Sequence, residues 1–192
     1  MSGYKIRLML YSQTETWREV EIPDNITFER LHYIIQKVFG FRRSHMWEFR
    51  IPNQDPEVDE VNMEDIARTI DCDDAFDVIV SEVFDENVIA LYEYDFGDSW
   101  AVIVYKVEDT KYKNKTALLT DYKGKYNPID DMGGVFVFDE IMEAINDGED
   151  VLGVLDEYGM SERHLEMMDF EEKYEIGSRI RLNDPVMVWS VK

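Results

Sequence analysis

The stretch 92-YEYDFGDSWAVIVYKV-107 holds two apolar runs on either side of the triplet Gly97-Asp98-Ser99. Both runs carry apolar residues at consecutive positions, which is typical of strands that are buried on both faces in the middle of a sheet. Gly97 can take a positive φ without steric cost, and Asp98 can accept hydrogen bonds from nearby backbone amides. The pattern therefore predicts a central β-hairpin at residues 88–108.

Two catalytic motifs share letters with this turn. Asp95-Phe96-Gly97 matches the DFG triplet of kinases, but a kinase also needs a glycine-rich phosphate loop, a lysine on its third strand and an HRD loop, and the sequence holds none of them. Gly97-Asp98-Ser99 matches a triplet of lipase-like hydrolases, which draw a base from a downstream Asp-x-x-His. Here the late His164 is preceded by Ser-Glu-Arg, and the segment after Ser99 reads as a strand instead of a helix. The sequence supports neither motif.

Towards the N-terminus, the chain has the pattern of two strands, a helix and a third strand. Apolar and polar residues alternate over 4–11, and a second strand-like run covers 17–22, so these two segments are predicted to pair. A helix is predicted between the N-cap residue Thr27 and Gly40, because apolar residues recur there at helical spacing. A further strand is predicted over 46–51. This ββαβ order indicates a β-grasp-like N-terminal portion.

The middle of the chain alternates between acidic and apolar segments. An acidic surface excursion follows the third strand and is predicted to contain a short helix over 63–70. A strand is predicted near 117–120. Residues 127–134, "NPIDDMGG", read as a loop because of the proline and the paired glycines, and the helix that follows is predicted to end at Gly148.

The last part of the chain completes the predicted fold. Asp169 and Glu172 have the spacing of a capping box and predict a further helix, and residues 185–191 read as a closing strand. The sequence therefore predicts a single α+β domain over residues 1–192. Its sheet is expected to be mixed or antiparallel, with the hairpin at residues 88 to 108 in its centre and helices towards the C-terminus.

Net charge limits the classes of partner. The 192 residues carry a formal net charge of −22, which would repel phosphate backbones over most of the surface. The charge is uneven, because residues 1–50 hold eight lysine and arginine residues against six acidic ones, whereas the remainder holds twelve against thirty-six. An anionic partner is therefore expected to contact the first quarter of the chain or the lysine-rich segment described below.

The number of cysteines and the absence of long apolar runs indicate in which cellular compartment the protein resides. Cys72 is the single cysteine, which excludes intrachain disulfides and multi-cysteine metal sites and fits a reducing environment. The N-terminus has no apolar run of signal-peptide length, and no window approaches the length of a membrane helix. The protein is expected to be cytoplasmic and to have no membrane partner.

No metal or cofactor motif is complete. Asp71, Asp73 and Asp74 lack the glycine turn and the distal glutamate of a calcium loop, so they read as a solvated acidic loop. His32 and His164 lie in or near predicted helices, where packing or solvent exposure is expected. The sequence therefore predicts no metal site and no cofactor.

One segment is basic against the acidic background. Cations beside aromatic rings are what single-stranded nucleic-acid binding uses, and the same lysines can instead protect the edge of a sheet from pairing with other chains. The protective role is favoured, and nucleic-acid binding stays as an alternative. The residues of that alternative are Lys111, Tyr112, Lys113, Lys115, Lys123 and Lys125.

Three blocks of the sequence resemble one family. They are "WREVEIPDNITFERLHYIIQKVFGFRRSHMWEFRI" (17–51), "LYEYDFGDSW" (91–100) and "NPIDDMGGVFVFDEIMEAI" (127–145), in this order. Together they resemble the plasmid pRiA4b Orf-3-like family, which occurs on plasmids, in insertion elements as passenger proteins, and in many chromosomes. The resemblance implies a single α+β domain. The family's resolvase-like label comes from genetic neighbourhood and implies no activity here.

The resemblance also points to individual residues. Relatives often have histidines where this chain has Trp47 and Val102, and a cysteine where it has Met132. If those residues form a chemical cluster in relatives, the resemblance implies that this chain keeps only His45 of it. The positions that match the family pattern are His45, Phe49, Asp95, Phe96, Gly97, Asp98, Trp100, Gly133 and Gly134.

Three hypotheses about function follow. The leading one is a non-catalytic binding or interaction domain with an unknown protein partner, homodimerisation being left open. The second is an accessory nucleic-acid-binding protein associated with mobile elements. The third is a metal-assisted, hydrolase-like enzyme that gathers His45, Asp95 and Asp98 in one cleft. The candidate binding residues of the leading hypothesis are His45, Asp95, Asp98, Trp100, Gly133 and Gly134.

Overall fold

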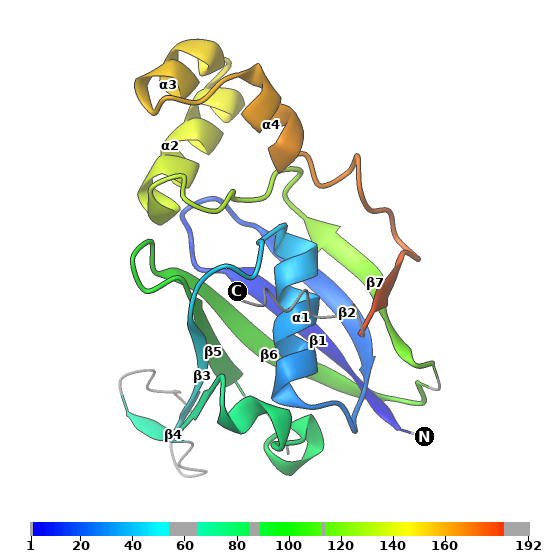
Figure 1. Ribbon diagram of the computed structural model, residues 1–192. Helices are drawn as coiled ribbons and strands as arrows, with labels where there is room; N and C mark the ends of the chain where they lie inside the picture. The colour runs from blue at the N-terminus through cyan, green and yellow to red at the C-terminus, as the bar shows by residue number, and fades with distance from the viewer. Residues whose placement is uncertain (1, 54–64, 85–88, 113, 183–192) are drawn as a thin grey trace, which may run out of the picture.

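The strands of the protein form one antiparallel sheet in the computed structural model, which describes residues 2–53, 65–84, 89–112 and 114–182 (Figure 1). The strands are β1 (Gly3–Leu10), β2 (Trp17–Pro23), β3 (Trp47–Pro52), β4 (Ile66–Asp71), β5 (Ile89–Tyr94), β6 (Trp100–Thr110), β7 (Thr116–Lys123) and β8 (Arg179–Arg181). Their order in the eight-stranded sheet is β4-β3-β5-β6-β1-β2-β7-β8. The predicted α+β class is confirmed.

The central hairpin is confirmed, but its turn differs from the prediction. β5 and β6 pair from Ile89↔Tyr105 to Tyr94↔Trp100 and have a neighbouring strand on their other sides. The positive φ that was predicted for Gly97 falls instead on Asp95 (56°) and Ser99 (52°), the first and last residues of the turn. The reason is that the turn closes through the Ser99 N–H, which donates to the Asp95 carbonyl at 2.6 Å.

The N-terminal elements form as predicted, whereas their arrangement is not confirmed as β-grasp-like. β1 and β2 pair as an antiparallel hairpin, and α1 (Phe28–Phe39) follows. The Thr27 side chain accepts a hydrogen bond from the Arg30 N–H at 3.4 Å, and Gly40 ends the helix at φ 76°. The sheet order places β5 and β6 between β1 and β3.

Two predicted helices are wrong. The segment predicted as a helix over 63–70 is strand β4 from Ile66 onwards, because it pairs with the edge of β3 and buries Ile70 opposite Phe49. The Asp169–Glu172 pair does not start a helix. Asp169 instead ends one, and its carboxylate accepts hydrogen bonds from the N–H groups of the next turn.

The remaining helices gather beyond one end of the sheet (Figure 1). They are α2 (Gly134–Asp147), α3 (Val151–Glu157) and α4 (Glu162–Met168), and two short 3-10 turns cover Asp74–Phe76 and Val80–Glu82. In the described parts of the chain, no helix has the length and apolar character that crossing a membrane requires. The closing strand predicted over 185–191 lies outside the described residues.

Helix α1 covers one face of the sheet with an apolar stripe that includes two polar side chains. Leu31, Ile34, Ile35 and Val38 are fully buried. His32 and Gln36 also point inwards, and both contact the hydroxyl of Tyr92 on β5: the His32 Nδ1 lies 2.7 Å from it, and the Gln36 Nε2 donates to it at 2.9 Å. This shared hydroxyl fixes the helix on the strand, since a buried polar group without a partner is costly.

His32 is neutral in the folded protein. Its ring stacks on Trp47 with centroids 4.0 Å apart, and burial lowers its pKa to about 3. The unfolded chain takes up a proton on this histidine near its ordinary pKa of about 6.5. Protons therefore favour the unfolded state as the pH falls below about 6.5, and His32 should destabilise the fold progressively down to about pH 3.

We predict that acidification from about pH 7 to pH 5 lowers the free energy of unfolding of the natural protein by about 2 kcal/mol more than that of His32→Gln. Glutamine keeps an amide that can face Tyr92 but cannot titrate. Urea unfolding of both proteins at the two pH values measures the difference. The same loss in both would contradict the assignment of this acid sensitivity to His32.

Candidate functional site

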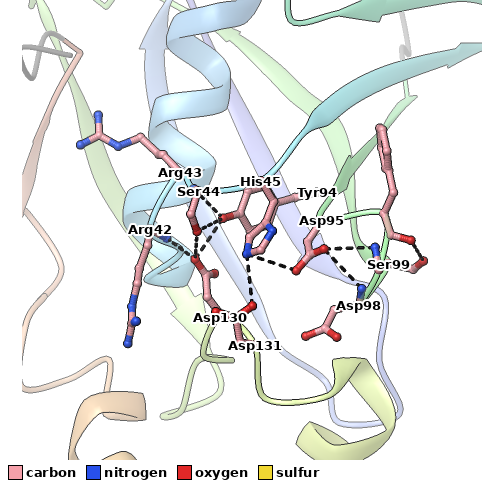
Figure 2. Close-up of polar contacts among 12 residues, drawn as sticks. Arg42, Arg43, Ser44, His45, Tyr94, Asp95, Asp98, Ser99, Asp130 and Asp131 are labelled. Carbon is pink, nitrogen blue, oxygen red and sulfur yellow. Dashed lines mark hydrogen bonds and ion pairs between the residues drawn. The ribbon is translucent and has the colours of Figure 1, made fainter. Parts of the chain in front are cut away.

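Three segments from distant parts of the chain meet at the end of the sheet that faces α2 (Figures 1 and 2). They are residues 42–46 before β3, the turn 95–99 between β5 and β6, and the loop 127–133 before α2. The Asp95 N–H donates to the Met46 carbonyl at 3.0 Å and joins the first two segments. The turn and the loop are joined through Asp98 and Gly133. The end of the sheet is thus built from tertiary contacts.

Asp95 has two roles in this arrangement. Its Oδ1 accepts a hydrogen bond from the Gly97 N–H at 3.1 Å and lies 3.5 Å from the Asp98 nitrogen, which holds the turn. Its Oδ2 points the other way and lies 3.5 Å from the Nε2 of His45 (Figure 2). One oxygen therefore maintains the backbone while the second faces the site.

His45 lies between two carboxylates. Its Nε2 is 3.5 Å from Asp95 Oδ2 and 3.3 Å from Asp131 Oδ1, and the ring meets Tyr94 edge-on at 5.7 Å. Neither carboxylate forms a hydrogen bond of acceptable geometry with the buried Nε2. The donor atoms of His45, Asp95 and Asp131 all lie within 4.8 Å of one another. The Asp95 side chain is 12% exposed and that of Asp131 is 70% exposed, so the cluster opens to solvent on one side.

Asp130 anchors the loop beside this cluster. Its Oδ2 accepts hydrogen bonds from the Arg42 N–H at 2.9 Å, the Tyr94 hydroxyl at 3.0 Å and the Ser44 hydroxyl at 3.2 Å (Figure 2). Burial raises the pKa of Tyr94 to about 12, so its hydroxyl stays protonated and can donate. A buried carboxylate with three donors is a rigid connection, and it fixes the segment that carries His45.

The glycine pair allows α2 to begin against the turn. Gly133 (φ 98°) donates its N–H to Asp98 Oδ2 at 3.3 Å. A Cβ atom on Gly134 (φ 80°) would lie only 2.8 Å from the backbone oxygen of Asp98. Both glycines are therefore explained by left-handed backbone and by a close approach of two main chains.

Unusual backbone conformations are concentrated here. Among the described residues, the non-glycine residues with positive φ are Arg43, Asp95, Ser99 and Asp131, and all four belong to the segments of this site. Each such residue costs free energy and persists only where its surroundings hold it in place. The site is therefore preorganised by the contacts around it.

The structure brings some of the predicted binding residues together and separates others. His45 and Asp95 are adjacent, whereas Asp98 is engaged with the glycine pair. Trp100 is fully buried and packs between Phe41 and Phe138, so it belongs to the core. Sequence reasoning missed Asp131, for which the acidic pair in "NPIDDMGG" was the only available signal.

The described lysines of the nucleic-acid alternative lie before β7 and at or after its end. Lys111 and Lys115 precede the strand, and Lys113 is outside the described residues. At the far end, Lys123 pairs with Glu15, and Lys125 pairs with Asp169 at 3.1 Å. Tyr112 is buried and donates its hydroxyl to the Thr116 carbonyl, so its ring is not available for stacking.

The positions at which relatives often carry histidine or cysteine are buried. Trp47 is 9% exposed, Val102 is fully buried and Met132 is 7% exposed. The Met132 Sδ accepts a hydrogen bond from the Ile129 N–H at 3.2 Å. These side chains belong to the core of this protein. The His45 Nε2 faces the carboxylates of Asp95 and Asp131.

Comparisons with known proteins show family and fold. The family model described as "Plasmid pRiA4b ORF-3-like protein" matches residues 2–177. "Uncharacterized protein y4hQ" of Sinorhizobium fredii (strain NBRC 101917 / NGR234) is 30% identical over 138 residues, which cover 68% of this chain and 66% of that protein. The chain thus spans about two thirds of the length of this relative.

A solved structure is also similar. The crystal structure of the protein of unknown function MM3350 from Methanosarcina mazei Go1 has a TM-score of 0.63 and 28% sequence identity to this chain. The similarity covers 80% of this chain and 89% of that one. Neither relative carries a name that states an activity.

We predict that Gly134→Ala lowers the free energy of unfolding by at least about 1 kcal/mol more than Gly148→Ala. Both positions have a left-handed φ, which costs an alanine about 1 kcal/mol. At Gly148 an added Cβ would meet nothing within 4 Å, whereas at Gly134 it would meet the Asp98 backbone. Urea unfolding of the two variants compares them, and equal losses would contradict the close approach.

Proposed function

The chain belongs to the plasmid pRiA4b ORF-3-like protein family, and from this premise we propose that it is a binding domain built around a divalent metal ion. The ion is held by His45, Asp95 and Asp131. This proposal keeps the leading hypothesis of a non-catalytic binding domain and adds a metal ligand set that the sequence did not predict. The alternative of a metal-assisted hydrolase assigned Asp98 to the same cleft, but the Asp98 carboxylate accepts a hydrogen bond from the Gly133 N–H instead.

The observation that carries the proposal is the spacing of the three donor atoms. A tetrahedral ion with bonds of about 2.1 Å to nitrogen and oxygen ligands separates neighbouring ligand atoms by about 3.4 Å. The His45 Nε2 lies 3.3 Å from the Asp131 oxygen and 3.5 Å from the Asp95 oxygen. These two separations match two edges of such a coordination polyhedron, and the Asp95 and Asp131 oxygens lie within 4.8 Å of each other.

An ion pair alone accounts less well for this geometry. A protonated histidine that donates to a carboxylate does so at about 2.7–2.9 Å with the hydrogen pointing at the oxygen. Here both contacts are longer, and neither has acceptable hydrogen-bond geometry. The Nε2 faces the space between the two carboxylates, as a ligand of a shared ion would.

The surroundings favour a cation and a partner. Asp98 and Asp130 add two carboxylates next to the cluster, so the local potential is negative. One imidazole and two carboxylates suit Zn²⁺ or Mn²⁺. Because the Asp131 side chain is mostly exposed, a fourth coordination position is open towards solvent, where a group of a binding partner can coordinate.

We predict that the full chain, freed of metal with EDTA and then dialysed, binds one Zn²⁺ or Mn²⁺ ion in isothermal titration calorimetry. His45→Ala and Asp131→Asn should each weaken the affinity at least about tenfold, because the first removes the imidazole ligand and the second removes the negative charge of a carboxylate ligand. The matched controls are His164→Ala on α4 and Asp73→Asn in the exposed acidic loop, and both should bind like the natural protein.

Two results would contradict this function. The first is that neither ion binds to the natural protein. The second is that His45→Ala and Asp131→Asn bind the ions as tightly as the two control variants do. Asp95→Ala is a poorer test, because the Asp95 side chain also holds the turn and its removal would destabilise the fold.

A further inference from the structure

Basic side chains gather around the C-terminal end of α1. Two hollows of about 280 and 260 Å³ adjoin there, and both are lined by Gly40, Arg42 and Lys173. The cations around the pair of hollows are Lys37, Arg42, Arg43, Arg163 and Lys173, against the single acidic residue Glu166. In a chain with a net charge of −22, such a concentration of positive charge requires an explanation.

Many cations elsewhere on the protein are neutralised by carboxylates. Lys5, Arg50, Lys123 and Lys125, for example, all form ion pairs. By contrast, in the described part of the chain no carboxylate lies within ion-pair distance of four of the five basic residues that line the hollows. Those unpaired residues are Arg42, Arg43, Arg163 and Lys173, and all four are exposed.

Helix capping does not account for this cluster. Cations near the C-terminus of a helix interact favourably with its dipole, and Lys37 in the last turn of α1 fits that role. Arg163 and Lys173 come from α4 and from the segment after it, far from α1 in the sequence. The fold therefore brings cations from three segments to one place.

The positions of these cations are held by the fold. The Arg42 N–H donates to buried Asp130, and the Arg43 N–H donates to buried Gln36 at 2.8 Å. The Arg43 guanidinium lies over the ring of Tyr33, and the Lys173 Nζ donates to the Met167 carbonyl at 2.7 Å. These contacts hold the main chain at Arg42 and Arg43 and the side chains of Arg43 and Lys173.

We propose that the two hollows bind the phosphate groups of a single-stranded nucleic acid. The arginine side chains present planar donors that fit phosphate oxygens, and two adjoining hollows with shared cations suit consecutive phosphates of a polymer. Half-buried Tyr174 lines the second hollow and places an aromatic ring beside the charges. This ring does not belong to the lysine–tyrosine segment considered from the sequence.

The charge distribution favours a single strand over a duplex. Residues 51–192 hold thirty-six acidic residues against twelve basic ones, so a wide duplex would bring many phosphates close to negative surface. A single strand can follow the pair of hollows and leave the rest of the surface uncovered. This proposal uses residues other than His45, Asp95 and Asp131 and does not depend on the metal ion.

The test is fluorescence anisotropy of the full chain with a labelled single strand of about 12 nucleotides, in buffer with EDTA so that metal binding plays no part. Contact with about three phosphates predicts that the affinity falls about 20-fold between about 50 and 200 mM salt. Arg163→Ala combined with Lys173→Ala should weaken binding about tenfold at low salt and flatten the salt dependence.

The matched control is Lys111→Ala combined with Lys115→Ala, which removes two exposed cations elsewhere and should leave binding unchanged. The proposal is overturned if no single strand binds at low salt, or if the control variant loses as much affinity as the Arg163/Lys173 variant. It is also overturned if blunt duplex, or a single nucleotide as competitor, binds as well as the strand.

Discussion

The contact between the Asp98 turn and the glycine pair is the constraint on which the end of the sheet depends. Two main chains meet there with no room for a side chain between them, since a Cβ on Gly134 would fall within 2.8 Å of the Asp98 oxygen. The Gly133 N–H adds a hydrogen bond to the Asp98 carboxylate. This contact sets where α2 begins and brings the preceding loop, with Asp130 and Asp131, beside Asp95 and His45.

Strand β5 connects this end of the sheet to helix α1. Two of its tyrosines face the covered side, and their hydroxyls serve different neighbours: Tyr92 contacts His32 and Gln36 on the helix, and Tyr94 donates to Asp130 in the loop. Gln36 also accepts the Arg43 N–H. Buried polar groups thus tie the helix, the strand and the site into one network, because each of these groups needs a partner away from water.

The sequence predicted the elements that are set by interactions between neighbours in the chain, and it missed those that are set by tertiary contacts. The hairpin of β5 and β6 and the limits of α1 follow from neighbours in the chain, namely the two apolar runs beside the turn, Thr27 and Gly40. Strand β4 was missed because only Ile70 of its residues is buried, and its pairing with β3 is a tertiary effect. Asp131 was missed for the same kind of reason. Asp131 comes close to His45 only when the folded sheet brings two distant loops together.

The three ligands of the proposed metal site lie on segments that meet only in the complete fold. These segments are the one before β3, the turn after β5 and the loop before α2. They are far apart in the sequence, so nothing holds them together in an unfolded chain. An ion that needs all three would bind the native state and not the denatured one, so its concentration would enter the folding equilibrium itself. Part of the free energy of unfolding of the domain would then depend on the concentration of the metal ion. The amount of folded protein would rise and fall with the supply of that ion.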